Sequence, residues 1–175
     1  MSQLATGLKV SQMNGVKVYN CSAGKTMPQW LKDYNSGKVQ SLRYNREYRD
    51  RIELIQDFDF PSASTCIKMS NDQQYIGVAG VYKPQIKVFD TNELAMKFER
   101  HIDSEIVDFS FISDDYSKII MARNDRTLEI HASYGKHFSV RVPKFVRQLA
   151  YHYPSCDVYC ASSSNEIFRL NLSQG

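Results

Sequence analysis

The chain has 175 residues, which is the size of one ordinary domain, and its 42% hydrophobic and 23% charged residues are typical of a folded protein. The formal net charge is only +3, which excludes a whole-molecule field that attracts nucleic acid. Met1–Asn20 shows no secretory signal, no run reaches the ~20 apolar residues that span a bilayer, and four cysteines are too few for a disulfide framework, so we expect an intracellular protein without membrane contact.

The first 26 residues divide into a tail and a strand. We expect residues 1–12 to form a flexible N-terminus and residues 13–26 to hold a strand of an earlier or ring-closing repeat, because Gly15–Asn20 resembles the later stretch Ile86–Asp90. Gly24-Lys25-Thr26 resembles the end of a phosphate-binding loop. The glycine that this motif needs five positions earlier is Tyr19 here, so we predict a turn instead of a nucleotide site.

Residues 27–60 are predicted to be a helical, basic insertion. Pro28 suits the first turn of a short helix, and Asn35-Ser36-Gly37 ends it. From Val39 to Ile55 the apolar positions approximate helical spacing. Residues 32–51 carry six basic and three acidic residues, which is the entire charge excess of the chain.

Arginines and tyrosines alternate within this insertion. Arginine clamps phosphate through its planar fork and tyrosine stacks on bases, so the segment is a candidate RNA-binding site. Its residues are Arg43, Tyr44, Arg46, Tyr48, Arg49 and Arg51. The alternative is a solvated helix face with internal ion pairs such as Arg46–Asp50, and composition alone favours it because the intermixed acids dilute the charge.

The remainder, residues 61–175, contains a repeat. An alternating apolar run, a polar turn and a second apolar run occur at 66–79 and again at 109–122, where Ser70 and Ser113 mark the same point 43 residues apart. A third copy follows at 149–161, with Pro154 at the corresponding point. Each copy continues into a third strand, and the first two into a fourth.

Four short strands recurring every ~40–45 residues are typical of WD40-type propeller blades, so we predict an all-β partial propeller of about three blades. Strict alternation indicates that each strand buries one face. Asn124-Asp125-Arg126 suits a two-residue hairpin. The third copy stops before its fourth strand, so we expect a fragment or a piece of a larger assembly. An unrelated β-sandwich with evenly spaced hairpins is the alternative.

No chemical constellation emerges from the remaining polar residues. His152, Cys156 and Cys160 have a spacing that suggests zinc, but a fourth ligand is missing from the pattern, and buried structural cysteines are commoner. The acidic pairs 57/59 and 114/115 have no general-acid partner, and the serines at 162–164 lack the frame of a nucleophile elbow. We therefore predict no catalytic residues, no metal, no cofactor and no small-molecule substrate.

Several stretches together resemble the WD-repeat nucleolar protein ten family, also called essential nuclear protein two. They are 28–31, 51–58, 82–86, 97–100, 113–118, 124–126, 143–145, 151–157 and 169–172. The resemblance implies a non-enzymatic scaffold of the small-subunit processome, located in the nucleus and nucleolus. Its expected partners are processome proteins and precursor ribosomal RNA. A generic WD-repeat adaptor of another intracellular complex is the alternative.

Two positions depart from the family pattern. Val146 stands where the family usually has glycine after Pro-Lys-Phe, and Gln73 stands where a turn glycine is common. Both departures put the local turn geometry in question, because a side chain disfavours positive φ.

Overall fold

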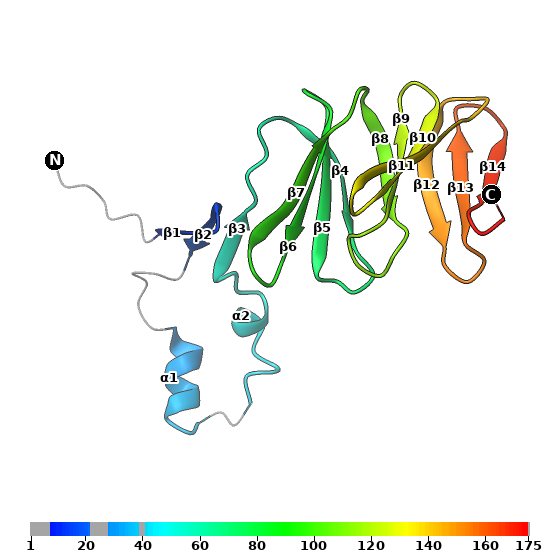
Figure 1. Cartoon of the computed structure of the whole chain (residues 1–175). Coiled ribbons are helices and arrows are strands. Elements are labelled where there is room, and N and C mark those ends of the chain that lie inside the picture. The colour runs from blue at the N-terminus through cyan, green and yellow to red at the C-terminus, as the bar shows by residue number, and fades with distance from the viewer. Residues whose placement is uncertain (1–7, 22–27, 39–40, 175) are drawn as a thin grey trace. The chain divides into compact units, whose positions relative to one another are not determined.

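The structure is a computed structural model that describes residues 8–21, 28–38 and 41–174. It divides into two compact units, Met1–Asp59 and Phe60–Gly175 (Figure 1). Each unit is built from antiparallel sheets with consecutive strands as neighbours.

The first unit contains one three-stranded sheet with the order β1-β2-β3. Its strands are β1 (Lys9–Met13), β2 (Val16–Asn20) and β3 (Leu54–Asp57), and the helices α1 (Gln29–Asn35) and α2 (Arg46–Arg49) lie between β2 and β3 in the chain. Asn14 and Gly15 have φ values of 50° and 85° and connect β1 to β2 as a two-residue hairpin. Asparagine and glycine are the residues that such a turn favours, because both of its central positions need positive φ.

Two predictions for this unit are wrong in part. Residues 9–12 form most of β1 and are not a flexible tail. The dipeptide Asn14-Gly15 is typical of a two-residue β-hairpin and indicates a strand on each side of it. Residues 54–57 are a strand and not helix, because Leu54–Asp57 pairs with Lys17–Asn20 of β2. The predicted turn at Gly24-Lys25-Thr26 lies outside the described residues.

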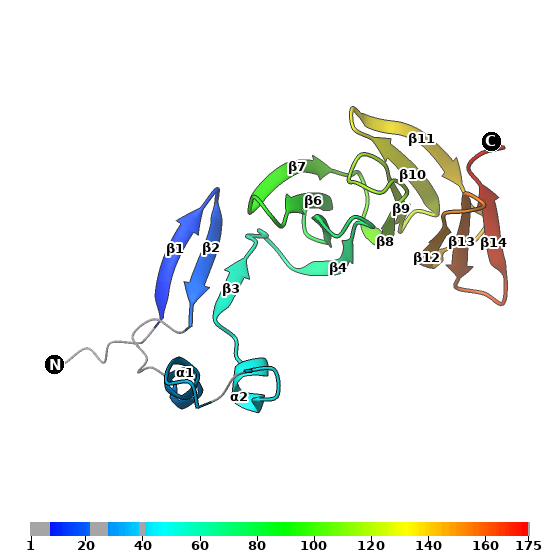
Figure 2. The same cartoon turned by 90° about the horizontal axis from the view of Figure 1, so that it is seen from below.

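The second unit contains three sheets that follow one another in chain order (Figures 1 and 2). The first holds β4 (Ser64–Met69), β5 (Tyr75–Gly80), β6 (Gln85–Asp90) and β7 (Ala95–His101). The second holds β8 (Ile106–Phe111), β9 (Ile119–Arg123), β10 (Thr127–Ala132) and β11 (Gly135–Arg141). The third holds β12 (Val146–His152), β13 (Asp157–Ser162) and β14 (Ile167–Asn171). These sheets are called blades 1, 2 and 3 below, and they confirm the predicted propeller repeat.

The core lies between the blades. Phe109, Ile119 and Met121 of blade 2 pack against Ile86 and Val88 of blade 1. The opposite face of blade 2, including Ile120 and Leu128, packs against blade 3. Blade 2 therefore buries both faces, and every residue of β9 is buried. The prediction that each strand buries one face is wrong for β9, because blade 2 has a neighbouring blade on each side, and it is also wrong for β6, which is buried throughout.

The turns confirm the register of the repeat. In blade 1 the Ser70 hydroxyl accepts a hydrogen bond from the N–H of Tyr75 at 3.0 Å, and in blade 2 the Ser113 hydroxyl accepts one from the N–H of Lys118 at 3.1 Å. Both bonds span five residues and close the hairpin between the first and second strands. The serines 43 residues apart thus perform the same local task.

The turn between β9 and β10 differs from the predicted two-residue hairpin. It contains three residues, Asn124, Asp125 and Arg126, and it is Arg126 that has positive φ, at 67°. The last residue of a three-residue hairpin loop commonly adopts positive φ, and in this loop that residue is Arg126.

The two departures from the family pattern have different outcomes. Val146 begins β12, is buried and does not have positive φ, so the strand accommodates its side chain, and the pairing with β13 shifts register between Val146 and Gln148. Gln73 has a φ of 60°, so the turn keeps left-handed geometry although it carries a side chain.

Replacing Gln73 with glycine is expected to stabilise the protein by about 1 kcal/mol, because a non-glycine residue in the left-handed region costs about 1–3 kcal/mol. Gln73 is exposed, so the substitution removes no buried contact. Urea unfolding curves give the comparison. The matched control is Gln74→Gly: the φ of Gln74 is not positive, so the added backbone freedom is expected to lower stability. A lower unfolding free energy for Gln73→Gly would contradict the assignment of strain to this turn.

Candidate nucleic-acid interface

The predicted RNA-binding residues lie on and beside the single turn of α2. Asn45 caps the helix, because its side-chain oxygen accepts a hydrogen bond from the N–H of Tyr48 at 3.2 Å. The helix spans only Arg46–Arg49, so the six predicted residues are not one continuous helix face.

Arg51 and Tyr48 are engaged in a local cluster. The Arg51 guanidinium lies 3.7 Å from the centre of the Tyr48 ring and 5.3 Å from that of Trp30 in α1. It also donates to the Tyr48 carbonyl oxygen and pairs with Glu53, which raises the pKa of Arg51 above its usual value. Trp30 and Tyr48 meet edge to face at 5.2 Å. Arg51 and Tyr48 therefore link α2 to α1 through Trp30. The Arg51 guanidinium covers one face of the Tyr48 ring, so that face is not available for stacking on a base.

The other four candidates point to solvent. Arg43, Arg46 and Arg49 are exposed, and Tyr44 is 87% exposed. Arg46 forms the ion pair with Asp50 that the alternative interpretation predicts, at 3.3 Å between two exposed side chains, where such a pair adds little stability. Among the described residues, Arg43 and Arg49 have no side-chain hydrogen bond or ion pair. The six candidates thus fall into two groups: these four exposed residues, and Tyr48 and Arg51, which pack with Trp30.

A buried carboxylate joins all three blades, which sequence reasoning missed. Asp108 of β8 is 5% exposed and accepts hydrogen bonds from the N–H of Leu149 in β12 at 2.7 Å and from the Cys66 thiol in β4 at 3.2 Å. Lys68 of β4 pairs with it at 3.1 Å. Burial, followed by the bond to Asp108, raises the pKa of Cys66 to about 11, so the thiol stays protonated and can donate. Asp108 therefore connects the neighbouring first strands of the blades (Figure 2).

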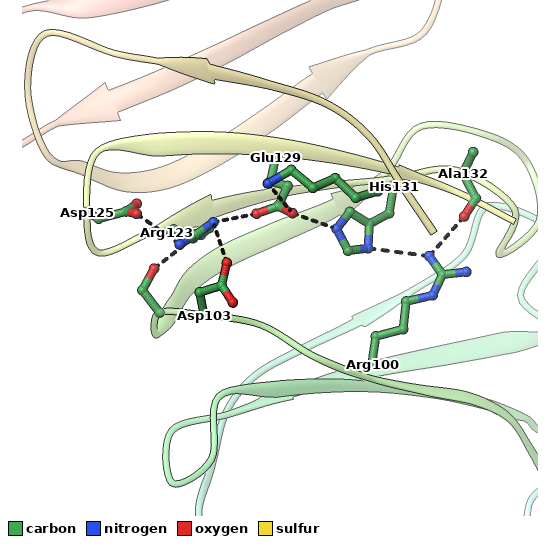
Figure 3. A network of polar contacts seen from close by, with 9 residues as sticks. Arg100, Asp103, Arg123, Asp125, Glu129, His131 and Ala132 are labelled. Carbon is green, nitrogen blue, oxygen red and sulfur yellow. Dashed lines mark hydrogen bonds and ion pairs between the residues drawn. The ribbon is translucent and has the colours of Figure 1, made fainter. Parts of the chain in front are cut away.

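A second polar network lies at the junction of blades 1 and 2 (Figure 3). Glu129 of β10 is 4% exposed and binds Arg123 at 2.6 Å, His131 at 3.0 Å and Lys136 at 3.2 Å. Burial raises the pKa of Glu129, but these three donors outweigh burial and leave the pKa below its usual value. Arg123 in turn donates to the Ser104 hydroxyl and pairs with Asp125.

Arg100 of β7 extends this network across the junction. It donates to the carbonyl oxygens of Ala132, the last residue of β10, at 2.9 Å and of Ser133, the next residue, at 2.8 Å. Its Nη1 also lies 3.4 Å from Nδ1 of His131. Because arginine only donates, Nδ1 of His131 must accept and Nε2 must carry the proton that is directed at Glu129. The Nε2–H of His131 is therefore directed at Glu129.

The remaining candidates have local structural partners. His152 contacts the Ser155 hydroxyl, the Cys156 thiol donates to the Tyr153 carbonyl, and Cys160 is buried in the apolar core between blades 2 and 3. Asp115 accepts from Ser117 within its turn. Within residues 8–21, 28–38 and 41–174, no group of three or more His, Cys, Asp or Glu side chains is arranged to hold a metal, and no helix is long and apolar enough to span a membrane.

Comparison with known proteins decides the family. The model of the nucleolar protein 10-like N-terminal domain matches residues 9–175. The chain belongs to the nucleolar protein 10 family. Nucleolar protein 10 of Xenopus laevis is 50% identical over 168 residues, which cover 96% of this chain and 24% of the relative. Ribosome biogenesis protein ENP2 of Saccharomyces cerevisiae is 43% identical over 171 residues, which cover 96% of this chain and 24% of the relative.

The chain spans about a quarter of the length of these two relatives in the nucleolar protein 10 family. Among solved structures, the WD40 repeats of RRP9 superpose with a TM-score of 0.58 at 13% identity, covering 67% of this chain and 38% of that one. This likeness shows the propeller fold, in agreement with the blades described above.

Proposed function

We propose that the chain is a non-enzymatic scaffold of the small-subunit processome, which supports precursor ribosomal RNA processing and assembly of the 40S subunit in the nucleolus. The observation that carries this proposal is the match over 96% of the chain to proteins named for the nucleolus and for ribosome biogenesis. The contacts of two buried carboxylates also support a scaffold role, because Asp108 joins neighbouring blades and Glu129 joins neighbouring strands.

The exposed part of the basic segment is the proposed RNA contact. Arg43, Arg46 and Arg49 carry three positive charges on one short stretch, and Tyr44 offers an uncovered ring for stacking. Tyr48 and Arg51, which the sequence also suggested, position this surface and do not contact RNA. The proposed site therefore contains four of the six residues that sequence analysis singled out.

Replacing Arg43, Arg46 and Arg49 together with alanine in the full-length protein is expected to weaken binding of single-stranded precursor ribosomal RNA. Each lost phosphate contact lowers the slope of log affinity against log salt by about 0.7, so the slope should fall by about 2. Filter binding at several salt concentrations measures both quantities.

The matched control removes the same charge elsewhere. Arg141, Lys144 and Arg147 are exposed residues of the second unit, and their triple alanine variant carries an equal net charge. It should bind RNA with the affinity and slope of the unaltered protein. Equal losses in both variants would mean that net charge alone attracts RNA, and an unchanged slope in the Arg43/Arg46/Arg49 variant would remove the site.

A further inference from the structure

An apolar groove of about 730 Å³ lies between blades 2 and 3. Its walls include Ile112, Ile130 and Phe138 of blade 2 and Tyr151 and Leu170 of blade 3. Phe138 is 56% exposed, so much of its ring is accessible from the groove. The corresponding junction between blades 1 and 2 shows what such a groove accommodates.

In that first junction an aromatic side chain fills the space. Tyr116, from the turn between β8 and β9, packs against Tyr75 at 4.6 Å and Phe98 at 6.1 Å between ring centres. Tyr75 and Phe98 belong to blade 1, so Tyr116 is a plug that blade 2 inserts into its neighbour. Phe98 is partly buried, and the Tyr116 ring packs beside it against the same core.

The strand register makes Phe138 the counterpart of Phe98. Phe98 pairs with Val88, two residues before the end of β6, and Phe138 pairs with Ile130, two residues before the end of β10. The counterpart of the plug is missing, because seven residues separate β8 from β9 whereas only four separate β12 from β13. Within the described part of blade 3, the shortened turn places no aromatic ring against Phe138.

The groove also differs from the first junction in charge. Lys118 immediately precedes β9 and corresponds to Tyr75, the first residue of β5, since each donates its N–H to the turn serine five residues earlier. His137 lies beside Phe138 on β11. None of the described residues that line the groove is acidic. Lys118 therefore favours an acidic ligand group, and the exposed ring of Phe138 favours an aromatic one.

We propose that this groove binds an acidic peptide segment of a partner protein, with one aromatic side chain seated against Phe138 where Tyr116 sits in the preceding junction. An aromatic anchor supplies large buried area and an edge-to-face contact, and the flanking carboxylates face Lys118. This site is separate from the basic surface around α2, so it stands or falls independently of the RNA contact.

The test uses the full-length protein and a fluorescein-labelled seven-residue peptide with one central tyrosine flanked by aspartates, followed by fluorescence anisotropy. The peptide should bind, Phe138→Ala should weaken binding about tenfold, and Lys118→Glu should weaken it by a similar factor. Two control peptides, one with alanine for the tyrosine and one with lysines for the aspartates, should bind more weakly than the tyrosine–aspartate peptide.

Tyr82→Ala is the matched protein control, because Tyr82 is an aromatic residue 83% exposed on another turn, and it should leave the affinity unchanged. Circular dichroism confirms that each variant is folded. Absence of peptide binding, equal binding by Phe138→Ala, or displacement of the peptide by a uridine oligonucleotide would each overturn the proposal.

Discussion

Substituting Asp108 with alanine is expected to destabilise the second unit by about 3–5 kcal/mol, because the change removes one partner of a buried ion pair and leaves hydrogen-bond donors of two other blades unsatisfied. The N–H of Leu149 loses its acceptor, and Lys68 loses its counterion. Urea unfolding followed by circular dichroism measures the loss. It is a large fraction of the stability of an ordinary domain.

Asp103→Ala is the control for this prediction. Its side chain is 90% exposed and its carboxylate lies 3.9 Å from Arg123, so the change is expected to stay within about 0.5 kcal/mol. A loss below 1 kcal/mol for Asp108→Ala would mean that the three blades are held together by apolar packing alone.

Substituting Glu129 with alanine is expected to cost a similar amount, about 3–5 kcal/mol, because Arg123 is left nearly buried without its closest counterion. His131 also loses the acceptor of its Nε2 proton. Thermal and urea unfolding of the purified variant give the value.

The double variant Arg123→Met with Glu129→Leu separates pairing from packing. Replacing both members of a buried ion pair with apolar residues of similar size is often neutral, so much of the lost stability should return. If the losses of the single variants Arg123→Met and Glu129→Leu simply added up in the double variant, a direct interaction between these side chains would be contradicted.

The strands of the second unit could be predicted because the repeat specifies them. Alternating apolar runs, Ser70 and Ser113 at equivalent turns, and a period of about 40 residues all describe local structure, which neighbours in the chain determine. The first unit was harder. Its strand β3 pairs with β2 across more than 30 residues, and no short-range signal at 54–57 announces that pairing.

The sequence identified the segment that contains the candidate RNA surface, but not which of its side chains are exposed. Composition identified the arginines and tyrosines, whereas only the fold shows that Trp30 brings Arg51 and Tyr48 into a closed cluster. Asp108 was missed because its partners stand about 40 residues away in each direction, on other blades. The same holds for Phe138, whose exposure depends on the length of a turn in the next blade.

Affinity purification of the tagged full-length protein at moderate salt is the sharpest test of the proposed role in small-subunit assembly. The eluate is probed for precursor ribosomal RNA and for processome proteins. We predict that both co-purify. Their absence, together with a reproducible set of other partners and a cytoplasmic location, would contradict the nucleolar function and leave a WD-repeat adaptor of another complex.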